Sequence, residues 1–87
     1  MNLTDLLGLT AAAIITFAMA PQVIKIGKTK NTRDLSLGTF ILVSSSLFLW
    51  FIYGILINSY PIIIGNAIGF LLNIYIVIMK IKYGDNS

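Results

Sequence analysis

The residues that can take part in chemistry in this sequence are few, uncharged and set inside long apolar stretches. Trp50 and Asn66 stand out, because an indole and a carboxamide are unusual within segments this apolar. The 87 residues include no cysteine, no histidine and only three acidic side chains. A disulfide framework, a metal centre and histidine-based catalysis are therefore excluded, and we expect neither a cofactor nor an enzyme.

Trp50 and Asn66 are expected at similar depths in neighbouring apolar segments, about 7–10 Å from the ends of those segments. An indole face stacks on the apolar C–H face of a sugar ring, and an amide exchanges hydrogen bonds with hydroxyl groups. The alternatives for Trp50 are packing or an interfacial position, and the alternative for Asn66 is a hydrogen bond between helices. A pair of sugar-binding side chains is the functional interpretation.

Three apolar segments are long enough to cross a bilayer as helices. They cover about 3–26, 37–57 and 61–79. A polar loop at 27–35 and a tight turn at 58–60 join them, so consecutive helices must be antiparallel. The predicted fold class is an all-α membrane protein, with residues 1–87 forming a single three-helix transmembrane domain.

The basic residues predict the orientation in the membrane. They are Lys25, Lys28, Lys30, Arg33, Lys80 and Lys82. All six fall on one side of a three-span protein, which places the N-terminus outside and the C-terminus in the cytoplasm. They are expected first to determine topology and second to contact lipid phosphates. Because the net charge of +3 lies at the ends of apolar runs, we expect no nucleic-acid partner.

The first segment raises two further questions. Ala18–Ala20 has the small residues of a signal-peptidase site, but no basic residue precedes the apolar run, so we expect the segment to be retained. Pro21 cannot donate to the carbonyl of Phe17, which predicts a kink. From the residues alone the kink is interpreted as static, and Gln22 is placed to bond the freed backbone or a second copy of itself.

Small and polar residues form one stripe on the third segment. Gly65, Gly69 and Asn73 recur every four residues, and Asn66 lies seven before Asn73. Gly65 and Gly69 form a GxxxG pair, which predicts close helix packing. On the second segment, Tyr53 lies one turn outward of Trp50, where it is placed to close an outer gate. These stripes indicate the sides turned away from lipid.

Four stretches of the sequence resemble the SWEET and SemiSWEET transporters. They are the PQ-loop signature at 20–25, the following 29–36, the segment 49–55 and the segment 61–66. The resemblance covers nearly the whole chain and points to the bacterial half-size members. It implies two identical three-helix bundles in parallel, around an axis along the membrane normal, that work by alternating access.

The resemblance also implies roles for individual residues. Trp50 and Asn66 from both protomers would form a central sugar site, with Pro21 and Gln22 as hinge and inner gate. Family members end the second helix with an Arg and an Asp that help to lock the outer gate. Here the corresponding positions are Ile57 and Ser59, so the outer closure must rely on Tyr53 and on apolar or hydrogen-bonding contacts.

The lack of ionisable side chains in the apolar segments favours passive transport over ion-coupled transport. Between Leu6 and Ala20, and from Leu35 to Met79 apart from Tyr side chains, no ionisable group occurs. A coupled carrier usually keeps such a group at the midplane. We therefore expect passive, bidirectional uniport of a mono- or disaccharide across the bacterial inner membrane. The alternatives are a PQ-loop carrier of another solute, such as an amino acid, and a small membrane subunit without transport activity.

Overall fold

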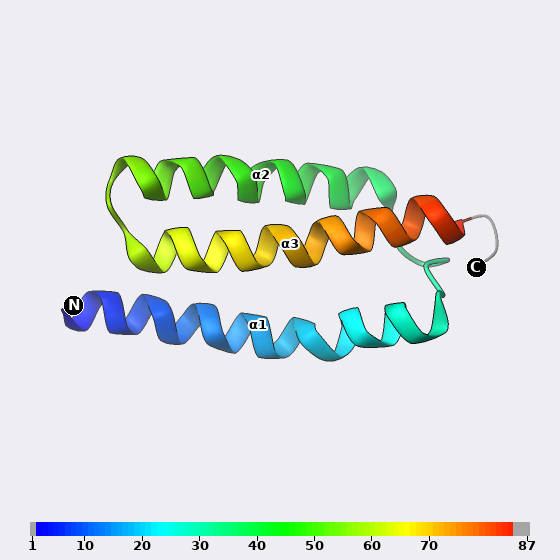
Figure 1. Cartoon of the computed structure of the whole chain (residues 1–87), viewed down its shortest axis with the longest axis horizontal. Helices are drawn as coiled ribbons and strands as arrows, with labels where there is room; N and C mark the ends of the chain where they lie inside the picture. Colours follow the sequence, from blue (N-terminus) through cyan, green and yellow to red (C-terminus); the bar gives the residue numbers. More distant parts are fainter. Residues whose placement is uncertain (1, 85–87) are drawn as a thin grey trace.

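The computed structural model describes residues 2–84 and has three helices (Figure 1). They are α1 at Leu3–Thr29, α2 at Leu37–Leu56 and α3 at Tyr60–Tyr83. Each is long and apolar enough to cross a bilayer, so the all-α membrane fold expected from the sequence is confirmed. Residues 1 and 85–87 of the predicted domain lie outside the described part of the chain.

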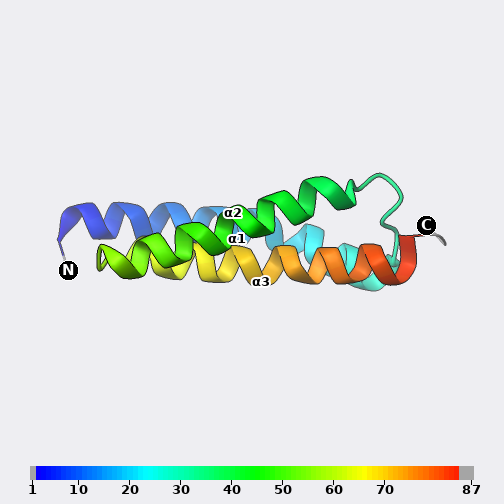
Figure 2. The ribbon, with the colours of Figure 1, turned by 90° about the horizontal axis from the view of Figure 1, so that it is seen from above.

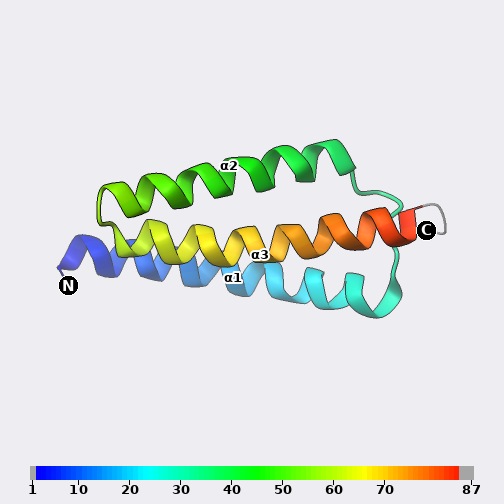
Figure 3. The ribbon, with the colours of Figure 1, turned by 45° about the horizontal axis from the view of Figure 1, so that its top comes forward.

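The spatial order of the helices differs from their order in the sequence. α3 lies between α1 and α2 and packs against both, and within residues 2–84 α1 and α2 do not pack directly (Figures 1 and 3). α2 runs antiparallel to both other helices, and α1 and α3 run parallel. The start of α1 and the end of α3 therefore lie at opposite ends of the bundle (Figure 1).

Each helix begins at a polar side chain that accepts a hydrogen bond from the backbone of its first turn. These capping residues are Asn2, Ser36 and Ser59. α1 continues through Gly27–Thr29, whereas the sequence predicted its end at about residue 26. It ends before Lys30, whose N–H still donates to the Ile26 carbonyl and whose left-handed backbone (φ 55°) turns the chain out of the helix.

Small residues bring α1 and α3 close together. A Cβ atom on Gly8 would lie 2.6 Å from Cβ of Pro61, and one on Gly65 would lie 3.1 Å from Cβ of Ala12. Each of these pairs joins residues 53 positions apart, as expected for parallel helices in a constant register. The predicted close-packing role therefore suits Gly65, whereas a Cβ on Gly69 would reach only ordinary contact, 3.5 Å from Leu47.

α1 stays helical through Pro21 but changes direction in the segment that follows it (Figure 1, cyan). The ring removes the donor that would bond the Phe17 carbonyl, which weakens the helix on that side. Beyond the bend, a Cβ atom on Gly27 would lie 2.5 Å from the hydroxyl of Tyr75, so α1 and α3 stay close there as well. The change of direction after Pro21 agrees with the predicted kink.

At the basic end of the bundle the α1–α2 loop lies beside the end of α3 (Figures 2 and 3). The ammonium group of Lys80 donates to the carbonyl oxygen of Thr32 at 2.8 Å, and Thr32 is completely buried. Lys30 from the loop and Lys82 from α3 each lie 5.4 Å from the centre of the Tyr83 ring. Cation–π attraction therefore adds to the hydrogen bond at this end.

Replacing Lys80 with methionine is expected to loosen this end of the bundle. The substitution keeps most of the side-chain length but removes the donor to Thr32, at a cost of about 1–2 kcal/mol. Thermal unfolding in detergent micelles measures the change. Lys82→Met is the matched control, since Lys82 is exposed and its described contact is with the Tyr83 ring alone. Equal losses for both variants would contradict a specific role for the Lys80 bond.

Candidate functional site

A groove of about 620 Å³ runs along α3 between α1 and α2. Its floor is formed by residues of α3, and its walls come from the facing sides of the other two helices. The floor residues are Pro61, Ile62, Gly65, Asn66, Gly69, Leu72 and Asn73. The walls are Gly8, Ala12, Ile15, Thr16 and Met19 from α1, and Thr39, Phe40, Val43 and Leu47 from α2. None of these residues is charged.

Asn66 supplies a polar group to the groove floor. Its Nδ2 donates to the carbonyl of Ile62 at 2.8 Å, a bond within the same helix. This leaves the amide oxygen and the second N–H available to a molecule in the groove. The neighbouring Gly69 has no side chain, so the floor on that side of the amide stays open, whereas α1 packs closely on Gly65 on the other side.

Trp50 lies outside this groove and beside Tyr53. Their rings meet edge to face with centroids 5.3 Å apart, and they line a separate recess of about 290 Å³ with Ser46 and Leu49. Trp50 is 51% exposed. It follows the groove residue Val43 by two helical turns, so it lies on the same side of α2. A single chain thus does not bring Trp50 and Asn66 into one pocket, although both lie on the side of the protein that carries the groove.

The predicted hinge and gate residues lie away from the groove floor. Pro21 and Gln22 are exposed on α1, and the Gln22 amide makes no hydrogen bond to the described residues. Ser59, at one of the two positions where the resemblance implies an outer-gate charge in other family members, caps α3, and its N–H donates to the Gly54 carbonyl at 2.9 Å. This position therefore supports the α2–α3 turn.

Asn73 is a second groove residue, which belongs to the predicted polar stripe of the third segment but was not predicted as a site residue. It is only 4% exposed, and its Nδ2 donates to the Gly69 carbonyl at 2.8 Å. Its hydrogen bonding repeats that of Asn66 two turns earlier. The available signal was the seven-residue spacing of two asparagines on an otherwise apolar helix.

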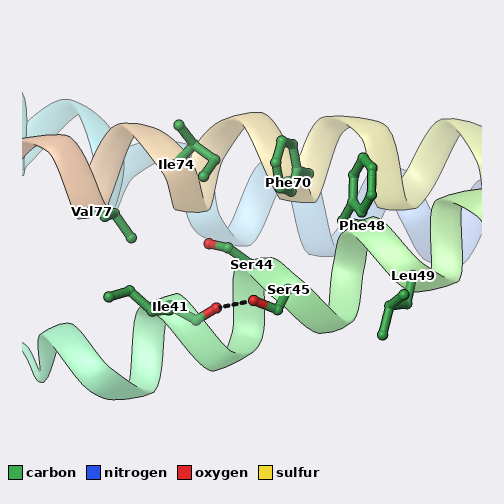
Figure 4. A pocket seen from close by; sticks show the side chains of 8 residues that line it. All are labelled: Ile41, Ser44, Ser45, Phe48, Leu49, Phe70, Ile74 and Val77. Carbon is green, nitrogen blue, oxygen red and sulfur yellow. Dashed lines mark hydrogen bonds between the residues drawn. The ribbon is translucent and has the colours of Figure 1, made fainter.

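A second cleft, of about 410 Å³, lies between α2 and α3 and shares no lining residue with the groove (Figure 4). Its lining is apolar except for Ser44 and Ser45. The Ser45 hydroxyl donates to the Ile41 carbonyl at 2.9 Å, as expected for serine within a helix. Ser44 is buried, and its hydroxyl has no partner in the described structure. This lining offers little to a polar solute.

The fold and the site define a small three-helix membrane protein with an uncharged, amide-bearing groove along one side. Residues 5–87 match the family model MtN3_slv, described as a sugar efflux transporter for intercellular exchange. The chain therefore belongs to the MtN3/SWEET family, and its curated relatives place it with the half-size SemiSWEET members. This is a family of transporters and not of enzymes, in agreement with the sequence-based expectation.

Two curated relatives match over almost their entire length. The sugar transporter SemiSWEET of Bradyrhizobium diazoefficiens is 46% identical over 82 residues, covering 94% of this chain and 95% of the relative. The sugar transporter SemiSWEET of Leptospira biflexa is 35% identical over 83 residues, covering 95% and 98%. The similarity thus includes all three helices.

Solved structures share the fold. A crystal structure of a bacterial homologue of SWEET transporters superposes with a TM-score of 0.87 and 47% identity, covering 95% of this chain and all of that one. A crystal structure of SemiSWEET in the inward-open conformation gives a TM-score of 0.90 at 30% identity, covering 98% and 91%. The arrangement with α3 in the middle therefore belongs to a known transporter fold.

Proposed function

We propose that this protein is a sugar transporter that carries a mono- or disaccharide across the bacterial inner membrane in both directions, by alternating access in a parallel homodimer. The observation that carries the proposal is the groove, which presents neutral amides and hydroxyls and contains no charge. The names of the relatives, sugar transporter SemiSWEET, support sugar as the solute.

The homodimer follows from the incomplete site of one protomer. The groove is flanked by α1 and α2 and needs a facing surface to become a path. A second copy, related by a twofold axis along the membrane normal, supplies this surface and is the simplest closed assembly. Trp50 and Asn66 of each protomer then face a shared cavity, two indoles and two amides around one sugar.

The same axis keeps the basic ends of both protomers on one side of the membrane. That side is the cytoplasm by the distribution of Lys and Arg, which places the N-terminus outside. Lipid phosphates are the expected partners of the exposed basic side chains there. In the transport cycle the bend at Pro21 acts as a hinge for the inner half of α1, with Gln22 at the inner gate. Tyr53 closes the outer side above Trp50.

Uptake is expected to need no ion gradient. None of the groove residues is ionisable, so the groove offers no ionisable group that would bind a driving proton or sodium ion. Proteoliposomes should equilibrate a labelled sugar at the same initial rate with and without a pH or sodium step. Empty liposomes give the background. Accumulation above the external concentration, driven by either step, would contradict uniport.

Binding tests the sugar assignment itself. Trp50 is the only tryptophan, so a change in its fluorescence has a single source. A panel of sugars and amino acids, each titrated into the purified protein, should quench the fluorescence with saturation only for sugars. Saturable quenching by an amino acid and by no sugar would replace the proposed substrate class.

A further inference from the structure

We propose that Asn73 is a second sugar-recognition residue, and that one sugar ring lies lengthwise on the groove floor between Asn66 and Asn73. The inference rests on the proposed transport function and assigns the inner half of the recognition site. In this arrangement the protein recognises the hydroxyl groups at the two opposite ends of the ring.

The spacing of the two amides fits one ring. Seven residues of helix separate them by about 10.5 Å, on the same side of α3. Two hydrogen bonds of about 2.8 Å each, one at either end, leave about 5 Å. That remainder is comparable to the separation of hydroxyl oxygens on opposite sides of a six-membered sugar ring. A ring placed along the helix therefore reaches both amides at once.

The floor between the amides is shaped to admit a ring. Gly69 lies between Asn66 and Asn73 on the same side of α3 and has no side chain. A Cβ there would contact Leu47 at 3.5 Å, so the position is open enough for a side chain yet carries none. Helix packing alone does not require glycine here, in contrast to Gly65, where α1 approaches closely.

The hydrogen bonding of Asn73 differs from that of an asparagine that bridges two helices. A buried amide in a membrane helix usually bonds to a neighbouring helix. Here the bond of Asn73 goes to Gly69 in its own turn, and none to α1 or α2 occurs among residues 2–84. Its amide oxygen and second N–H are thus left for another partner, the same arrangement that Asn66 shows.

The position of Asn73 beside α1 explains how a buried residue becomes accessible. The register of 53 positions that joins Gly8 to Pro61 places Asn73 level with Ala20, next to Pro21. Movement of α1 at this bend would uncover the inner end of the groove. Asn73 would then hold the ring while the path opens toward the basic end of the bundle.

Asn73→Leu tests the assignment, because leucine has similar volume but no amide. We expect it to weaken binding of D-glucose, galactose or mannose about two- to tenfold, read from Trp50 fluorescence. Against the 1-deoxy and 4-deoxy analogues, wild type should lose affinity for both. Asn73→Leu, in contrast, should bind one of the two analogues as tightly as it binds the parent sugar. This is the double-mutant-cycle result expected when the missing hydroxyl is the partner of the Asn73 amide. Thr10→Val, outside the groove, is the control.

The outcomes separate this inference from the proposed function. If Asn73→Leu weakens all analogues by one common factor, or leaves affinity unchanged, Asn73 does not touch the ring and the inference fails while sugar transport stands. If wild type itself shows no saturable quenching and no uptake with any of these sugars, the proposed function fails. Asn73→Ser, which keeps a small polar group, allows the same comparison of analogues should the leucine variant not fold.

Discussion

Replacing Trp50 with alanine is expected to reduce sugar uptake at least about tenfold and to leave the three helices intact. The ring is half exposed in the protomer and packs edge to face on Tyr53, so its removal leaves no cavity inside the bundle. A sugar face stacked on the indole would lose about 1.5–3 kcal/mol of contact free energy. Initial uptake into proteoliposomes measures the loss, with circular dichroism as the check on folding.

Two further variants make this result specific. Trp50→Phe keeps an aromatic face without the indole N–H and should retain an intermediate rate. Leu42→Ala, on an exposed position of α2 that does not line the groove, should transport like wild type. Asn66→Ala should lose uptake to a similar degree as Trp50→Ala. Uptake within about twofold of wild type in both Trp50→Ala and Asn66→Ala would remove these residues from the site.

Replacing Gly54 with valine is expected to prevent the α2–α3 hairpin from packing. A Cβ atom at this position would lie 2.7 Å from Cγ2 of Ile62 and 3.0 Å from the backbone nitrogen of Ile63. The Gly54 carbonyl also accepts the N–H of Ser59 in the turn, so the backbone there has little freedom to move. Overpacking of this kind costs about 1–3 kcal/mol or more. The unfolding midpoint in detergent should fall sharply, and the yield of folded protein with it.

Gly38→Ala is the matched control for that variant. Gly38 is also a glycine of α2, but a Cβ there would meet no atom within 4 Å. Alanine favours helix over glycine by up to about 1 kcal/mol, so the midpoint should stay the same or rise slightly. A Gly54→Val variant as stable as Gly38→Ala would show that α2 and α3 do not approach as closely as described.

The sequence predicted the number and type of the helices well because the bilayer requires long uninterrupted apolar segments. It predicted their ends less closely. α1 runs on to Thr29 and α3 to Tyr83, since charged side chains such as Lys80 and Lys82 can continue a helix beyond the apolar core. Apolar length marks the membrane-spanning part of a helix and not its final turn.

The order of the helices in space was beyond a single sequence. Short loops fix that consecutive helices run in opposite directions, but they do not say which helix lies in the middle. That outcome depends on contacts such as Gly8 with Pro61 and Gly65 with Ala12, which join residues 53 positions apart. The seven-residue loop between α1 and α2, about 30–36, is long enough for α1 to pack beside α3 instead.

The candidate site was predicted in part. Stripe spacing indicated a polar side on α3, and the structure places Asn66 on a groove floor there. Trp50 was expected to join Asn66, but depth alone does not place two side chains in one pocket, and the protomer keeps them apart. Asn73 went unassigned because its burial and its bond to Gly69 are properties of the folded chain.

The positions of the two ends of the chain restrict how such a unit can be doubled within one polypeptide. With three membrane-spanning helices, α1 begins at one membrane surface and α3 ends at the other. A short soluble linker between two copies would therefore turn the second copy upside down. Keeping both copies upright requires an extra crossing of about 20 apolar residues between them. Because the number of spans is odd, two upright copies require less added sequence as separate subunits than as one fused chain.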